Sequence, residues 1–258
     1  MVNYLDAGAR RAQSNVGGSG NLNAGANILG VSLSQREPFA SLIEKTDLRH
    51  IAIEGVIGAG KTTLAAMLGE TLGGKVVLEK FEENPFLKDF YGDPERYAFQ
   101  TQIFFLLTRY KQQRDLFQAD LFHRFLVTDY IFEKDKIFAY LNLQDEELKL
   151  YETLVTSIQH NIPTPDLVVY LQSSVPRLME NIRRRGRTFE NEMSETYIKD
   201  LNEAYNYFFF RYKATPLLIV NASELDFVAN KDHYNELLDE IFRPNRAAVE
   251  YYNPIRQQ

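Results

Sequence analysis

One short stretch near the start of the chain limits its possible folds more than any other. A largely apolar run, Ile51–Glu54, ends at Gly55 and is followed after four residues by Gly60-Lys61-Thr62. The spacing Gly-x-x-x-x-Gly-Lys-Thr is typical of a loop that follows a strand, curls its backbone N–H groups around phosphate oxygens and opens a helix. The stretch therefore predicts a strand, a phosphate-binding loop and a helix in succession.

The residue types of this loop match what phosphate binding requires. Glycine lets the backbone approach an anion closely, and the helix N-terminus adds a favourable dipole. Lys61 can neutralise the β- and γ-phosphates of a nucleotide, and the Thr62 hydroxyl can bind Mg²⁺. The alternative is a glycine-rich turn between strand and helix. We expect ATP and Mg²⁺ as cofactors, with the nucleotide held by Gly55, Ile57, Gly58, Ala59, Gly60, Lys61, Thr62 and Thr63.

The composition argues against several other classes of protein. The chain has 258 residues, a formal net charge of -6 and no cysteine. Proteins that bind nucleic acid or acidic membranes are usually basic, so neither is an expected partner. Without cysteine there are no disulfides, thiolate zinc sites or thiol nucleophiles. No apolar run approaches the roughly 18 residues of a membrane span, and no secretory signal pattern is present, so we expect a cytoplasmic protein.

The chain divides into two parts. Residues 1–47 contain a stretch rich in Gly, Asn and Ala at 15–27, which has no clear period and predicts a flexible extension. A transit peptide, or a segment that docks on the domain or mediates assembly, remains an alternative. Residues 48–258 are expected to form one domain.

Within this domain, apolar strands alternate with helices. That alternation predicts an α/β fold with a five-stranded parallel sheet and helices on both faces. The strands are expected at 51–54, 76–78, 125–128, 167–171 and 217–220. The helices are expected at 62–72, 85–91, 95–117, 132–141, 146–160, 176–185, 194–212 and 232–242, with a tail after the last helix.

Carboxylates follow two of the predicted strands. Because the carboxyl ends of parallel strands meet at one edge of a sheet, Glu79, just past the second strand, is expected beside the phosphate-binding loop. There it can orient a hydroxyl group and accept its proton during phosphoryl transfer, although Glu82 and Glu83 are close rivals. Asp129 closes the third strand. An acid in that position commonly holds Mg²⁺, and the alternative is a helix cap.

Polar residues near the start of the long predicted helix are candidates for substrate binding. Gln100 can present a donor and an acceptor to the edge of a base, and the Tyr91 hydroxyl can hold a sugar hydroxyl. Leu107 lies seven residues after Gln100 and therefore within ~20° of the same helix face, where its apolar side chain would suit a purine ring. The many nearby aromatic residues are expected mostly in the core or in a subunit contact.

Arginines form the second strong signal in the chain. Arginine stabilises the charge that spreads over a transferred phosphoryl group, whereas a helix C-terminus needs fewer cations than are present here. We therefore expect an arginine-rich lid rather than a simple cationic helix end. The arginine cluster is Arg183-Arg184-Arg185-Gly186-Arg187. Glu190, three residues after Arg187, could reach back to a sugar.

Three segments together resemble the deoxynucleoside kinase family, and its bacterial deoxyadenosine and deoxyguanosine kinases most of all. They are the loop from Glu54 to Leu64, the segment Asp93–Gln102 with its Phe-Gln-Thr core, and Arg185-Gly186-Arg187-x-x-Glu190. They occur in the family's order, and the resemblance covers about residues 49–243. It implies a P-loop kinase fold and a homodimeric enzyme of nucleotide salvage that phosphorylates the 5′-hydroxyl of a deoxynucleoside, purines preferred.

The resemblance also implies roles for single residues. Glu79 matches the family's catalytic carboxylate, and Gln100 matches its base-binding glutamine. Tyr91 and Glu190 match the pair on the sugar 3′-hydroxyl. The catalytic lid arginines match Arg185 and Arg187.

Two positions depart from the family pattern. Many members carry Asp-Arg-Ser or Glu-Arg-Ser after the third strand, whereas here Asp129 is followed by Tyr130, so the arginine near the 5′-hydroxyl is absent. A lid position that is often arginine is Asn181, for which Arg183 or Arg184 could compensate. These departures keep two alternatives open: a nucleoside monophosphate kinase, and a catalytically inactive kinase-fold subunit of an assembly.

Overall fold

A computed structural model describes residues 46–119, 123–160, 162–190 and 193–254 of the chain. The predicted extension over residues 1–47 lies outside these ranges except for its last two residues. Within them, no helix is long and apolar enough to cross a membrane.

Six parallel strands form one sheet in the order β2-β3-β1-β4-β5-β6. The predicted parallel α/β fold is confirmed, but the prediction of five strands is one short. Among the described residues the missed strand, β6, pairs with β5 alone, at the sheet edge. Its alternately exposed Val-Glu-Tyr-Tyr sequence lacks the continuous apolar run of the central strands. The strands are β1 (His50–Gly55), β2 (Lys75–Val77), β3 (Leu126–Thr128), β4 (Leu167–Gln172), β5 (Leu217–Asn221) and β6 (Val249–Tyr252).

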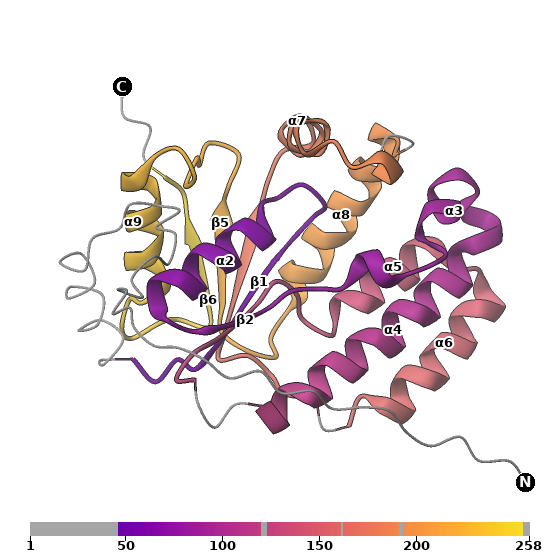
Figure 1. The fold of residues 1–258 in the computed structure, drawn as a ribbon, viewed down its shortest axis with the longest axis horizontal. Helices are drawn as coiled ribbons and strands as arrows, with labels where there is room; N and C mark the ends of the chain where they lie inside the picture. Colours follow the sequence, from indigo (N-terminus) through magenta and orange to yellow (C-terminus); the bar gives the residue numbers. More distant parts are fainter. Residues whose placement is uncertain (1–45, 120–122, 161, 191–192, 255–258) are drawn as a thin grey trace, which may run out of the picture.

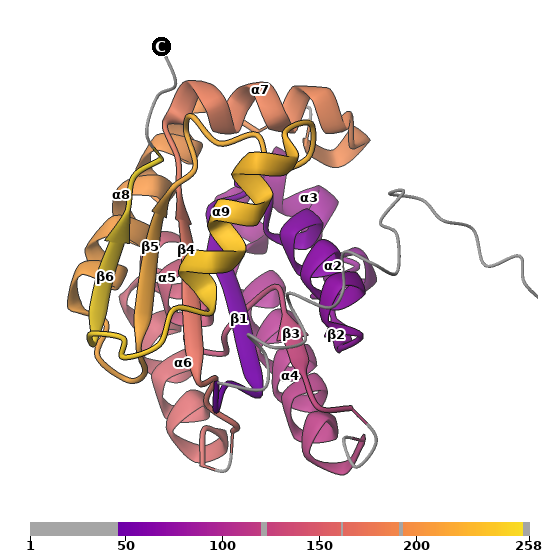
Figure 2. The same ribbon diagram turned by 90° about the vertical axis from the view of Figure 1, so that its left-hand side faces the viewer.

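Helices cover both faces of this sheet, as predicted. In Figure 1, α2 and α9 lie on one face, and α4, α5, α6 and α8 lie on the other. Figure 2 shows the strands from the side of α2 and α9, with α7 across their carboxyl ends. The α-helices are α2 (Lys61–Leu72), α3 (Leu87–Gly92), α4 (Pro94–Ala119), α5 (Lys134–Asn142), α6 (Asp145–Ile158), α7 (Val175–Arg185), α8 (Glu195–Arg211) and α9 (Lys231–Ile241). Two 3₁₀ turns are η2 (Phe81–Glu83) and η3 (Thr188–Glu190).

The predicted stop and start signals of the helices act as expected. Gly73 ends α2 with φ 61°, and Gly186 ends α7 with φ 65°, both in the left-handed region that glycine adopts without strain. The Ser194 side chain accepts a hydrogen bond from the Tyr197 backbone N–H at 3.0 Å and caps α8. These ends place the arginine-rich segment directly over the carboxyl edge of the sheet.

The central strands carry the core. All six residues of β1 are buried, and so are nearly all of β4 and β5. The polar residues that follow β1, β2 and β3 lie at the carboxyl edge of this parallel sheet.

Candidate active site

The phosphate-binding loop between β1 and α2 has a backbone that only glycine can provide at two positions. Gly58 has φ 86°, and a Cβ atom there would lie 2.7 Å from the Leu178 carbonyl oxygen of α7. Gly60 has φ 95° and forms the N-cap of α2. The loop is therefore shaped by positive φ angles and by the close approach of α7, and it directs the N-terminus of α2 toward the cavity.

Lys61 folds back over this loop. Its ammonium group donates hydrogen bonds to the carbonyl oxygens of Gly55 at 2.8 Å and Val56 at 3.1 Å. Burial lowers the pKa of Lys61 to about 8, with help from the Lys134 ammonium, while nearby carboxylates oppose the shift. A phosphate group would replace weak neutral acceptors with a charged one.

Asp129 links the loop to the predicted base. One carboxylate oxygen, Oδ2, accepts a hydrogen bond from the Thr62 hydroxyl at 2.6 Å, and Oδ1 accepts one from the Glu79 backbone N–H at 2.7 Å. These two oxygen ligands fit Mg²⁺, which typically takes one or two protein oxygens and completes its shell with phosphate and water. Asp129 thus joins the phosphate-binding loop to the segment that carries Glu79.

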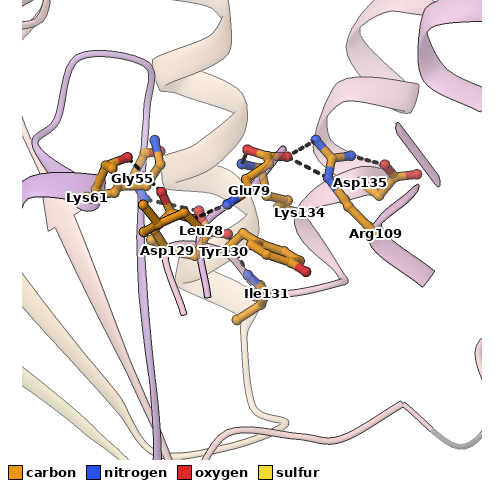
Figure 3. Close-up of polar contacts among 12 residues, drawn as sticks. Gly55, Lys61, Leu78, Glu79, Arg109, Asp129, Tyr130, Ile131, Lys134 and Asp135 are labelled. Carbon is orange, nitrogen blue, oxygen red and sulfur yellow. Dashed lines mark hydrogen bonds and ion pairs between the residues drawn. The ribbon is translucent and has the colours of Figure 1, made fainter. Parts of the chain in front are cut away.

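The Glu79 carboxylate lies between two cations from different helices. Its Oε1 accepts hydrogen bonds from Arg109 of α4, with Nε at 2.7 Å, and its Oε2 accepts one from the Lys134 ammonium of α5 at 2.7 Å (Figure 3). Burial alone would raise the pKa of Glu79, but Arg109 and Lys134 outweigh it and hold that pKa well below its usual range. The rival carboxylates, Glu82 and Glu83, are exposed and do not line the cavity.

Arg109 is itself held from the other side. Asp135 accepts a hydrogen bond from the Arg109 Nη1 and another, at 2.8 Å, from the Tyr151 hydroxyl of α6. The Gln102 side-chain amide donates to the Asp135 backbone carbonyl oxygen at 2.9 Å. The chain Glu79–Arg109–Asp135 is visible in Figure 3, and it fixes α4 against α5 beneath the cavity.

The lid arginines converge on a buried acid. Arg185 donates to the Glu190 carboxylate through both Nε, at 3.1 Å, and Nη2, and the Arg187 Nη1 lies 3.6 Å from the same carboxylate. The Arg187 guanidinium also lies 4.2 Å from the centroid of the Phe81 ring. Tyr91 lines the same cavity as Glu190, and burial raises the pKa of this tyrosine.

The departure at Asn181 has a structural explanation. Its side-chain amide donates to the Gly58 carbonyl oxygen at 2.8 Å and so ties α7 to the phosphate-binding loop. Arg184 donates to the Asn181 side-chain oxygen at 3.1 Å. Of the two arginines considered as compensation, Arg184 lines the groove beside the loop and Arg183 does not.

Most of the predicted residues come together around one cavity at the carboxyl edge of the sheet. A groove on the other side of the loop is lined by Gly58, Ala59, Gly60, Thr63 and Arg185, among others. Gly55 ends β1 and lines neither of them. The predicted residues that line the main cavity are Ile57, Lys61, Thr62, Glu79, Tyr91, Asp129, Arg185, Arg187 and Glu190.

The two residues predicted to contact the nucleobase, Gln100 and Leu107, line neither the main cavity nor this groove. Gln100 is exposed, and Leu107 is 52% exposed. The structure therefore contradicts their placement against a base. They do share a helix face, but the cavity lies on the face two residues further along, a rotation of roughly 200°. Gln102 and Arg109 occupy that face, 3% exposed each, and line the cavity.

Sequence reasoning missed three charged residues: Arg109 and Lys134, which bind Glu79, and Asp135, which binds Arg109. A signal for the first was present, because Gln102 and Arg109 are polar and share one face of a helix whose neighbouring positions are largely apolar. No local pattern identifies Lys134 or Asp135.

A search against protein-family models decides the family. The model described as deoxynucleoside kinase matches residues 51–244. This chain belongs to the deoxynucleoside kinase family. The family and the P-loop kinase fold predicted from sequence are confirmed, and so is the assignment as an ATP-dependent kinase of a deoxynucleoside.

Relatives of this kinase carry consistent names. A deoxyguanosine kinase of Bacillus subtilis is 36% identical over 72% of this chain and 93% of its own. A deoxyadenosine kinase of Dictyostelium discoideum is 38% identical over 70% of this chain and 76% of its own. Among solved structures, a deoxyadenosine kinase from M. mycoides with bound dATP superposes with a TM-score of 0.66 at 28% identity, covering 75% of this chain and 98% of that one.

Proposed function

We propose that this kinase transfers the γ-phosphoryl group of ATP to the 5′-hydroxyl of a purine deoxynucleoside, with Glu79 as the base. The observation that carries the assignment of roles is a single cavity that joins Lys61 of the phosphate-binding loop to the Glu79 carboxylate. A cation for the donor and a carboxylate for the acceptor at one site are what direct phosphoryl transfer needs.

Glu79 orients the acceptor hydroxyl. Because Arg109 and Lys134 keep its carboxylate ionised, it is a pure acceptor for the substrate O–H at neutral pH. In the step, the acceptor oxygen forms a bond to the γ-phosphorus, and the bond from that phosphorus to the bridging oxygen breaks with its electron pair left on ADP. The acceptor's proton passes to Glu79 as this happens.

The lid residues divide between sugar and phosphoryl group. Arg185 and Arg187 stabilise charge on the transferred phosphoryl group. For this, both arginines must exchange their contacts with Glu190 for contacts with that group when ATP binds. Glu190, released from the two arginines, holds the sugar 3′-hydroxyl together with the Tyr91 hydroxyl. Thr62 and Asp129 would hold Mg²⁺, which would supply positive charge to the phosphate groups of ATP.

The nucleobase of the substrate lies against the α4 face that carries Gln102. The side-chain amide of Gln102 can pair with an adenine or guanine edge, and Phe105 and Phe138 line the same cavity. Purine preference is supported by the names of the relatives. The apolar wall expected from Leu107 plays no part in this proposal, because that side chain faces away.

A coupled ATP assay against the four deoxynucleosides and their monophosphates tests the proposal. We expect deoxyadenosine or deoxyguanosine to have the highest kcat/KM and the monophosphates to be inert. A preference for thymidine would contradict the purine assignment. Turnover of a monophosphate would favour a monophosphate kinase, and turnover of nothing would favour the inactive subunit.

Three further expectations stay predictions. The homodimer is tested by light scattering on the full chain. The cytoplasmic location is tested by fractionation of cells that express it. The domain boundary is tested by expressing residues 48–258 alone, which should retain the activity of the full chain if residues 1–47 are an extension.

A further inference from the structure

Lys134 lies at the centre of the site, although no part of the proposed function assigns it a step. It is the first residue of α5, its side chain is 3% exposed, and it lines the main cavity. A lysine this deeply buried is rare unless its charge is paired. Its partner here is Glu79, at 2.7 Å.

The loop that brings Lys134 to this place is fixed at several points. The Ile131 backbone N–H donates to the buried Glu54 carboxylate at 2.8 Å, and the Thr128 hydroxyl donates to the Tyr130 carbonyl oxygen at 3.0 Å. The side chain of Tyr130 is fully buried, with its hydroxyl 3.4 Å from the Gln112 side-chain oxygen. Tyr130, the residue after Asp129, thus packs in the core. The cation that enters the cavity is Lys134, five residues after Asp129.

The two cations on Glu79 differ in how fully they are used. The Arg109 guanidinium bridges the Glu79 and Asp135 carboxylates. The Lys134 ammonium has three donors, and among the described residues Glu79 is its one hydrogen-bond partner. Figure 3 shows Lys134 beside Glu79 and Arg109 on the far side, toward Asp135. Lys134 therefore keeps donors for a ligand in the cavity, whereas Arg109 serves mainly to hold Glu79.

Lys134 also acts on the phosphate-binding loop. Besides burial, its charge is a cause of the lowered pKa of Lys61, and it partly offsets the effect of burial on the Glu54 carboxylate. Lys61 and Lys134 both line the main cavity, together with Glu79. The γ-phosphoryl group carries negative charge on three oxygens during its transfer, and two such cations suit it.

We propose that Lys134 is a catalytic residue that binds the transferred phosphoryl group while it holds Glu79. This inference rests on the proposed function. The bonds made and broken are those of the transfer step above, and Lys134 takes no part in the proton transfer to Glu79. Its Nζ donates to Glu79 before ATP binds and to a phosphoryl oxygen as well during transfer, so its effect is larger on turnover than on nucleoside binding.

The first test compares three variants with the wild type. Lys134→Met keeps an unbranched stem of similar length and removes the charge, and we expect kcat to fall ~10²–10³-fold with less than about a threefold change in the deoxynucleoside KM. Lys134→Arg should retain more kcat than Lys134→Met. The matched control is Lys136→Met on the same helix, which lines neither the cavity nor the groove and should leave kcat unchanged.

A second test separates contact with the phosphoryl group from action through Glu79. In a Glu79→Gln background the ion pair is already lost, so a lysine that only positions Glu79 would have no further effect there. We expect Lys134→Met to lower kcat by at least a further ~10-fold in that background. If Lys134→Met does not fold, as judged by circular dichroism, Lys134→Gln removes the charge but can still donate to Glu79, and it gives the same comparison.

The outcomes distinguish this inference from the proposed function. An active wild type with an inactive Lys61→Ala variant and an undiminished Lys134→Met variant would overturn the role of Lys134 alone. If Lys134→Met causes no further loss of kcat in the Glu79→Gln background, Lys134 is only a positioning residue, and its proposed catalytic role is also overturned. A wild type that phosphorylates none of the four deoxynucleosides would overturn both.

Discussion

The two ends of the active-site cavity are built in different ways. At the donor end, the phosphate-binding loop is shaped by backbone: positive φ angles at Gly58 and Gly60, and carbonyl oxygens of the loop that hold Lys61. At the acceptor end, the wall is made of side chains from separate elements, joined by the ion pairs of Glu79 and Arg109.

This difference predicts how each end responds to change. A backbone cradle presents its donors whatever the neighbouring side chains are, so one cation there has an effect that is largely its own. A network of buried ion pairs is coupled, and removal of one member leaves another charge without its partner. Substitutions at the donor end should therefore be severe but independent, and those at the acceptor end should interact.

The largest effect is expected at the donor end, from Lys61→Ala. The variant loses the cation proposed for the β- and γ-phosphates, so kcat/KM should fall roughly 10³–10⁵-fold, as for other cations that clamp a transferred phosphoryl group. The fold should survive, since the hydrogen bonds of the Lys61 side chain to described residues all go to carbonyl oxygens of the loop. The coupled assay measures the loss, with Lys231→Ala of α9 as the control. Near-normal activity of Lys61→Ala would contradict the phosphate-loop assignment.

Glu79→Gln is expected to come next. It keeps the shape of the side chain and one acceptor but removes the base, so turnover should fall ~10²–10⁴-fold with a smaller change in nucleoside affinity. Steady-state kinetics and isothermal titration with deoxyadenosine separate the two quantities. The exposed acid in Glu83→Gln provides the control, and if that variant is the damaged one, the base has been misassigned.

The lid gives an intermediate effect. Arg187→Lys keeps the charge but loses the planar fork, so we expect kcat to fall by about 10–10²-fold, while deoxynucleoside binding measured without ATP stays nearly constant. Arg183→Lys, an exposed neighbour outside the cavity, is the matched control. Equal losses of rate and binding in Arg187→Lys would indicate that this arginine supports the fold rather than the transfer step.

The same contrast explains which parts of the molecule could be predicted from sequence. The loop at Gly55–Thr62 is contiguous, so its spacing alone specifies strand, turn and helix. Glu79 follows from the strand that precedes it. Lys134 meets Glu79 only because the loop after β3 turns back over the sheet, and sequence separation hides such a contact. The edge strand β6 was missed because a half-exposed strand with a single neighbour needs no continuous apolar run.

The smallest effect should come from the α4 face that we propose to bind the nucleobase, and it tests which helix face does so. Gln102 lines the cavity and Gln100 is exposed, although both are glutamines two residues apart on one helix. Gln102→Leu removes the polar group proposed for the base, and the deoxynucleoside KM should rise ~10-fold, or about 1.4 kcal/mol, as expected for one hydrogen-bonded contact. Gln100→Leu makes the same chemical change outside the cavity and should leave KM unchanged. The reverse result would indicate that the nucleobase binds the α4 face predicted from sequence, with Leu107 rather than Arg109 beside it. The proposed acceptor end of the cavity would then be wrong.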